Sequence, residues 1–213
     1  MIRLLSQRGA RWVILLLALG GCAFGGRGQP TQLYMLTPLA AKEVQKTPDA
    51  RGPGIWVGPV ALPQYTNRPQ IVTGNTGPQV QRASSALWAE PLQDNFARVL
   101  AENLSLLLAT DQVAIFPWTS PMPVDYQVTV DVTQFLGELG GEASLTALWS
   151  LLGKNGKQVL ARKKSTFSQP TKSKDYDGFA AAMSQNLASL SREIAATITN
   201  LSQQAAPDSQ PAK

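Results

Sequence analysis

The chain has 213 residues, with 19 Lys and Arg against 14 Asp and Glu, one Cys and no His, and its formal net charge is +5. Because His is absent, Ser-His-Asp and Cys-His catalytic groups and His-containing zinc sites are excluded. One Cys supplies neither an internal disulfide nor an all-cysteine zinc site, so we expect no metal and no cofactor. A hydrophobic fraction of 44% with 15% charged residues is typical of a single globular domain.

A basic segment and a short apolar run open the chain. Three arginines and no acid among residues 1–11 precede eight apolar residues, 12–19, and Gly20, Gly21 and Cys22 end the run. The run is too short for a membrane span, which needs about 20 apolar residues, so we predict a signal peptide over residues 1–21. The sequence LGGC at residues 19–22 resembles a bacterial lipobox, in which the Cys is acylated and becomes the new N-terminus.

Cys22 is therefore the expected lipidation site, through which the mature protein is attached to a membrane. Ala23 stands where inner-membrane retention usually shows Asp, which predicts the periplasmic face of the outer membrane of a Gram-negative bacterium. The alternatives are a secretory signal with an incidental Cys and a short buried helix. Removal of residues 1–21 leaves 16 basic and 14 acidic residues, a net charge of +2, so charge does not favour nucleic acid as a partner.

Beyond Cys22, we predict a flexible Gly-rich spacer over residues 22–30, one domain over residues 31–204 and a disordered tail over residues 205–213. Strand or hairpin patterns mark residues 31–39, 55–62, 70–73, 79–82, 113–116, 124–133, 143–151 and 157–168. Along residues 124–133, Val and Tyr alternate with polar residues, which predicts one buried face and one wet face.

Two longer segments, residues 87–109 and 175–204, carry apolar residues at helical spacing. Pro91 and Glu90 suit the first turn of the first helix, where a missing N–H is tolerated and an anion is favoured. The apolar stripe of the second helix either packs on the sheet or meets a partner. The order of elements predicts an α+β fold: a two-layer sandwich of two long helices on a largely antiparallel sheet of about eight strands.

Three segments behind the lipobox carry a family resemblance. Residues 55–62 (IWVGPVAL), 63–72 (PQYTNRPQIV) and 88–92 (WAEPL) resemble the paraquat-inducible lipoprotein C (PqiC) family, the auxiliary lipoproteins of ABC-type and mammalian-cell-entry (MCE) lipid transport systems. The resemblance implies a non-enzymatic periplasmic component at the outer membrane. It implies, as a partner, an MCE protein whose tunnel carries lipid between the two membranes.

Six residues of these motifs are the predicted partner contacts: Tyr65, Asn67, Arg68, Pro69, Trp88 and Glu90. A rigid Pro and a planar guanidinium in a loop suit recognition of a carbonyl-rich or carboxylate surface. Structural alternatives stay open for three of them. Arg68 can cap a Pro-fixed turn, Trp88 can cover the sheet, and Glu90 can cap the helix or pair with Arg68.

A basic run without acids follows the predicted strand at residues 143–151. Its members are Lys154, Lys157, Arg162, Lys163, Lys164, Lys172 and Lys174. The first five are predicted to contact an anionic surface, either a membrane or an acidic partner. A solvated hairpin whose charges protect a sheet edge from aggregation explains the same residues.

The leading functional prediction is an outer-membrane-anchored lipoprotein that docks the distal end of an MCE tunnel and supports envelope integrity. Because a ring suits the end of a tunnel, we expect a homo-oligomer. One alternative is an assembly or structural lipoprotein that serves no transporter. The other is a carboxylate-dependent envelope hydrolase that uses Glu90 and Asp94, which lie four residues apart on one helix face.

Overall fold

The computed structural model describes residues 30–40, 52–75, 77–118, 123–153 and 156–205. The predicted signal peptide, the lipidation site, the spacer through residue 29 and the tail beyond residue 205 lie outside these residues. Neither helix of the described part combines the length and the apolarity that a membrane crossing requires.

Eight strands, two α-helices and one 3-10 turn make up the described part of the chain. The strands are β1 (Gln32–Tyr34), β2 (Ile55–Ala61), β3 (Gln70–Gly74), β4 (Val80–Trp88), β5 (Val113–Ile115), β6 (Tyr126–Gly137), β7 (Glu142–Gly153) and β8 (Gln158–Pro170). The helices are α2 (Leu92–Leu108) and α3 (Tyr176–Ala205), and the 3-10 turn is η3 (Gln64–Thr66). The predicted α+β class is confirmed.

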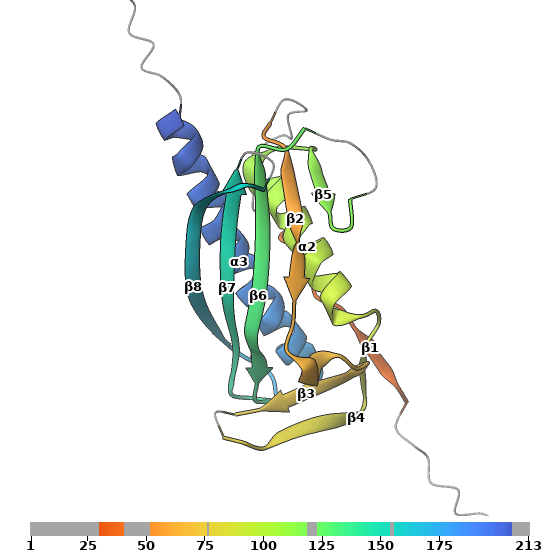
Figure 1. Ribbon diagram of the computed structural model, residues 1–213. Helices are drawn as coiled ribbons and strands as arrows, with labels where there is room; N and C mark the ends of the chain where they lie inside the picture. The colour runs from red at the N-terminus through yellow and green to blue at the C-terminus, as the bar shows by residue number, and fades with distance from the viewer. Residues whose placement is uncertain (1–29, 41–51, 76, 119–122, 154–155, 206–213) are drawn as a thin grey trace, which may run out of the picture. The chain divides into compact units, whose positions relative to one another are not determined.

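The strands are divided between two sheets, which the sequence did not indicate (Figure 1). The main sheet has the order β5-β2-β6-β7-β8, and the small sheet has the order β1-β4-β3. The longest pairings, β6 with β7 and β7 with β8, are antiparallel, whereas β2 runs parallel to both β5 and β6. The parallel pairs arise because the chain passes through the small sheet and α2 between β2 and β5, which is a crossover connection.

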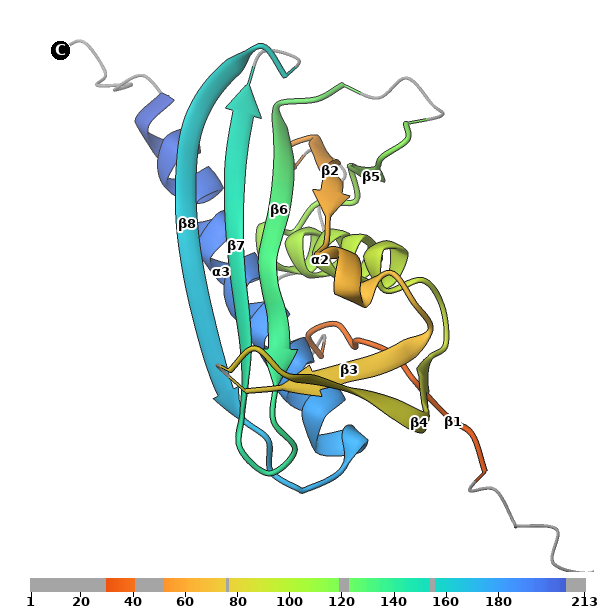
Figure 2. The same ribbon diagram turned by 60° about the horizontal axis from the view of Figure 1, so that its bottom comes forward.

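The small sheet lies across one end of the main sheet in both views (Figures 1 and 2), and its strand β3 contacts β6. Within it, β1 pairs in parallel with the end of β4, so that Tyr34 is opposite Trp88. The start of the domain and the end of β4 are therefore neighbours.

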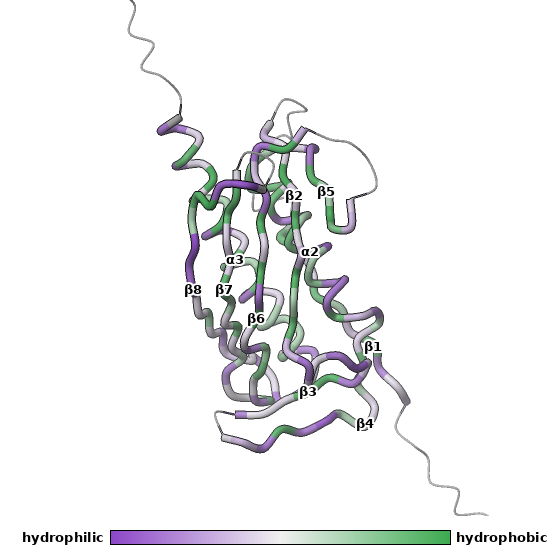
Figure 3. The backbone as a smooth tube through the Cα atoms, in the orientation of Figure 1, coloured by the Kyte–Doolittle hydropathy of each residue, from purple (hydrophilic) through white to green (hydrophobic). Residues whose placement is uncertain are grey.

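One face of the main sheet is apolar and is covered by both helices. Apolar and polar residues alternate along β6 and β7 (Figure 3), and Val128, Val130 and Val132 are at most 2% exposed. On β7, Leu145, Ala147, Trp149 and Leu151 are fully buried. Helix α3 contacts β7 and β8, and α2 contacts β2 and β5. The predicted buried faces are confirmed, since alternation at a period of two decides which side chains a helix can cover.

The apolar stripe of α3 packs within this domain. Its members Phe179, Met183, Leu187, Leu190, Ile194 and Ile198 are at most 1% exposed. Of the two alternatives for this stripe, packing on the chain's own sheet is therefore the observed one.

Helix α2 begins later than the apolar spacing indicates. Leu87 and Trp88, which the prediction places in the helix, are the last residues of β4, and Pro91 with φ −51° and ψ 123° is the N-cap of the helix. Pro suits this position because it has no N–H to leave unpaired at the helix start.

Residues 36–39, which we call the strap, run beside α2 and α3 and are not a strand. The sequence predicts a strand over residues 31–39, but β1 ends at Tyr34. The N–H groups of Leu36 and Leu39 donate to the Oδ1 atoms of Asn95 and Asn103 of α2, at 2.7 and 2.8 Å. The N–H of Thr37 donates to Ser184 Oγ of α3 at 3.1 Å. Side chains thus satisfy backbone groups that a neighbouring strand would otherwise pair.

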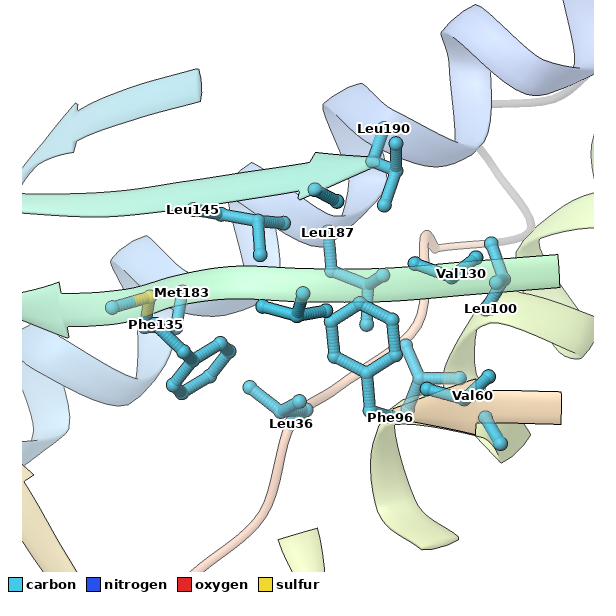
Figure 4. Packing of buried hydrophobic residues seen from close by; sticks show 14 of the residues in the cluster. Leu36, Val60, Phe96, Leu100, Val130, Phe135, Leu145, Met183, Leu187 and Leu190 are labelled. Carbon is cyan, nitrogen blue, oxygen red and sulfur yellow. The ribbon is translucent and has the colours of Figure 1, made fainter. Parts of the chain in front are cut away.

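The strap is part of the core. Leu36 is 1% exposed and belongs to the same buried cluster as Phe96 and Phe135 (Figure 4). Asn103 is fully buried, and its Nδ2 atom donates to Ser191 Oγ of α3 at 3.1 Å. One asparagine thereby connects the strap, α2 and α3.

We expect Asn103→Ala to lower the free energy of unfolding by about 1–3 kcal/mol, because it leaves the buried N–H of Leu39 without its acceptor. Urea denaturation of the purified protein measures this difference. Asn200→Ala, at an exposed position of α3, is the control and should change it by less than about 0.5 kcal/mol. Equal losses in the two variants would show that the strap does not depend on Asn103.

Candidate functional site

The loop from Pro63 to Pro69 is a rigid turn that begins with η3. The N–H and the hydroxyl of Thr66 both donate to the carbonyl of Pro63, at 2.9 and 2.7 Å. The N–H of Arg68 donates to the carbonyl of Thr66 at 2.8 Å, and the carbonyl of Pro69 accepts from the N–H of Trp88 at 2.7 Å. These bonds fix the loop and join it to the end of β4.

Tyr65 holds this loop against the main sheet. Its hydroxyl oxygen accepts a hydrogen bond from the N–H of Phe135 in β6 at 2.9 Å. The contact lies just beyond an irregularity in the β6–β7 register between Val132 and Gln134. Burial raises the pKa of the Tyr65 hydroxyl above its ordinary value. Tyr65 therefore positions the loop and is set apart from the other predicted contacts.

The other five predicted partner contacts gather around one pocket. The pocket has a volume of about 460 Å³, and Asn67, Arg68, Pro69, Trp88 and Glu90 all line it. We call it the loop pocket. Its walls come from two segments that the sequence separates by about 20 residues, because the Pro69–Trp88 hydrogen bond brings them together.

Trp88 lies in the floor of the loop pocket. It is 6% exposed, and its ring meets the ring of Phe135 edge-on with centroids 6.2 Å apart. Trp88 therefore covers the sheet, which is one of the two alternatives that the sequence left open for it. Only the part of its side chain that borders the pocket is accessible to a partner. Leu62 and the buried Leu92 add further apolar lining.

The charges around the loop pocket pair differently from the sequence-based alternatives. The Arg98 guanidinium donates to Glu90 Oε1, so Glu90 pairs with the next turns of α2 and not with Arg68. Arg68 is exposed, and its guanidinium makes no salt bridge or side-chain hydrogen bond within the described part of the chain. An unpaired planar guanidinium is free to take a carboxylate in bidentate geometry.

The proposed pair of catalytic carboxylates is not assembled. Glu90 lines the loop pocket, whereas Asp94 lines a separate hollow beside β2 and β5 together with Ile115 and Phe116. Among the described residues, no three metal-ligating side chains cluster. Glu90 and Asp94 therefore do not converge on one pocket as the acid and base of a hydrolase would.

The basic run is split between two faces of β8, an edge strand of the main sheet. Lys163 is opposite Trp149, on the helix side, and its Nζ lies 3.0 Å from Glu193 Oε1 of α3. Arg162 and Lys164 are opposite Ser150 and Leu148, on the face without helices. Lys157 is exposed just before the strand, and Lys154 lies outside the described residues. The members of the run on β8 therefore do not share one face of the sheet, and their place on an edge strand fits the protective alternative.

Some residues around the site were not predicted. Gln64 and Gln93 line the loop pocket from η3 and α2, and neither carries a sequence signal beyond its closeness to a motif. Leu33, on the edge strand β1 of the small sheet, and Met35, just after that strand, are exposed apolar residues. The four residues 33–36 are all apolar or aromatic, so the sequence did not indicate whether Leu33 and Met35 or Tyr34 and Leu36 would face the core.

Solved structures with the same fold exist. A crystal structure of an uncharacterized protein superposes with a TM-score of 0.64 at 24% identity, over 80% of this chain and 99% of that chain. A crystal structure of a protein from Xanthomonas campestris superposes with a TM-score of 0.63 at 22% identity, over 83% of this chain and all of that chain. These similarities establish the fold alone.

Sequence comparisons agree with the motifs around the loop pocket. The intermembrane transport lipoproteins PqiC of Escherichia coli (strain K12) and Shigella flexneri are each 27% identical to this chain over 188 residues, which are 86% of this chain and 97% of theirs. A family model described as ABC-type transport auxiliary lipoprotein component matches residues 34–195, most of the domain and both walls of the loop pocket. The chain belongs to the family of ABC-type transport auxiliary lipoprotein components.

Proposed function

We propose that this protein is a periplasmic lipoprotein, anchored to the outer membrane through Cys22, that docks the distal end of an MCE-domain tunnel protein. It would serve an ABC-type intermembrane lipid transport system and so support envelope integrity. The similarity to the PqiC lipoproteins, which are named for intermembrane transport, supports the transport role. The lipobox-like sequence at residues 19–22 supports the anchor.

The observation that carries the docking proposal is the loop pocket. Two motifs meet there, and the pocket combines an apolar floor at Trp88 and Leu92 with the exposed guanidinium of Arg68. Such a combination suits an apolar side chain flanked by a carboxylate or a carbonyl-rich turn on the partner. The rigid, hydrogen-bonded loop lowers the entropy cost of docking because it is already ordered.

A ring of copies is the simplest structure that meets the end of a tunnel, so the proposal includes a homo-oligomer. The exposed residues Lys157, Arg162 and Lys164 are proposed contacts with the anionic surface of an acidic partner protein, and Lys163 contributes less because it pairs with Glu193.

Arg68→Ala should reduce recovery of an MCE-domain protein that copurifies with this lipoprotein after crosslinking in the intact envelope. Loss of a charged hydrogen bond costs about 1.5–3 kcal/mol, which corresponds to binding weaker by about tenfold or more. The fold should persist, because the N–H of residue 68 still bonds to the carbonyl of Thr66. Mass spectrometry of the crosslinked material measures the recovery.

Arg82→Ala is the matched control, because Arg82 is exposed on β4 and does not line the loop pocket. Equal recovery from the two variants would remove Arg68 from the docking surface. Recovery of outer-membrane assembly proteins in place of an MCE-domain protein would instead favour a lipoprotein that serves no transporter.

Cys22→Ala should release the protein from the outer membrane, because the chain has no second Cys that could carry the lipid. Separation of the envelope membranes on a density gradient, followed by immunoblotting, measures the distribution. The unaltered protein should band with the outer membrane and the variant should appear in the periplasmic extract or remain unprocessed. Banding of the unaltered protein with the inner membrane would contradict the proposed location.

A further inference from the structure

Strand β1 and the residue that follows it, Met35, display two apolar side chains to solvent. Leu33 is 65% exposed and Met35 is 48% exposed, and Leu33 is the most exposed large apolar side chain among the described residues. β1 is the edge of the small sheet, so one side of it is unpaired within the described chain. The two residues alternate with Tyr34 and Leu36, which belong to the core.

Hydrogen bonds hold the segment around Leu33 and Met35 in place. The carbonyl of Tyr34 accepts from the N–H of Ala89 at 2.8 Å, and the N–H and carbonyl of Leu36 both bond to the Asn95 side chain. Because Tyr34 and Leu36 are held inward, Leu33 and Met35 cannot turn into the core. Any cover for Leu33 and Met35 must therefore come from outside this domain.

The position of β1 in the chain indicates what covers it. Eight residues separate Cys22 from Thr31. Fully extended, such a segment spans at most about 30 Å. Because β1 is the first element after Cys22, the stretch of chain that would link a membrane anchor to β1 is shorter than the stretch to any other element of the domain.

The composition around β1 also suits a lipid surface. Between Arg27 and Lys42 the chain carries no charged residue. Burial at a membrane interface thus dehydrates no charge on this segment, which is the main cost of bringing a protein surface to lipid. By contrast, Val159 is 61% exposed at the start of β8, beside the basic residues of that strand. Figures 1 and 2 place β8 and β1 on opposite sides of the domain.

We propose that Leu33 and Met35 contact the interfacial region of the bilayer that holds the lipid anchor, so that the β1 side of the domain faces the membrane. The inference rests on the proposed acylation of Cys22. Lipid chains and two apolar side chains then act as linked contacts on one membrane, which strengthens binding without a second anchor.

The single Cys allows a direct test. Acylation uses the thiol of Cys22, so Leu33→Cys and Met35→Cys each introduce one free thiol for an environment-sensitive nitrobenzoxadiazole label. The full-length lipidated protein is reconstituted into vesicles of phosphatidylethanolamine and phosphatidylglycerol that contain a spin-labelled lipid as quencher. Val159→Cys is the matched control, because Val159 is apolar and its exposure in the parent protein, 61%, is close to the 65% of Leu33.

The proposal expects blue-shifted emission and severalfold stronger quenching by the spin-labelled lipid at positions 33 and 35 than at position 159. Protein that floats with the vesicles but gives the same water-like signal at all three positions overturns the inference and leaves the anchor intact. Protein that does not float overturns the anchor together with the inference. A blue shift that persists without vesicles, in variants that also carry Cys22→Ala, assigns the cover to a second copy and overturns the membrane contact.

Discussion

The hydrogen bonds that the side chains of Asn95 and Asn103 accept from the strap are the constraint on which the packing of the strap against α2 and α3 depends. The two side chains lie eight residues apart on α2, and both are at most 1% exposed. They satisfy the N–H groups of Leu36 and Leu39, which are buried where no strand can pair with them. Through Ser184 and Ser191, α3 takes part in the same network. The segment that follows the proposed anchor is thus bonded directly to both helices.

The features proposed to act in docking and anchoring are neighbours, because β1 pairs with β4. β1 precedes the strap and pairs with the end of β4, where Trp88 forms the floor of the loop pocket. The same Trp88 N–H bonds to Pro69, which closes the loop that presents Arg68. A protein held by its N-terminus and by Leu33 and Met35 would therefore carry the loop pocket close to the membrane. That placement suits a component that receives the end of a tunnel at the outer membrane.

The sequence predicted those parts of the fold that a short repeat of apolar residues determines. Alternation fixed the buried faces of β6 and β7, and the apolar spacing identified α3 almost to its ends. The division into two sheets depends on long-range pairing, for which periodicity carries no signal. The strap was predicted as a strand because nothing local shows that Asn side chains far along the chain satisfy its backbone. At the site, the motifs identified five residues that line one pocket, but Glu90 pairs with Arg98 of α2 in place of Arg68.

Photocrosslinking from the loop pocket in the living cell tests the central claim most directly. A benzophenone amino acid is placed at Gln93, an exposed residue that lines the loop pocket, and at Gln203, an exposed residue near the end of α3. We predict that irradiation links position 93, and not position 203, to a periplasmic MCE-domain protein. Crosslinks to that protein from position 203 alone, or equally from both positions, would contradict docking at the loop pocket.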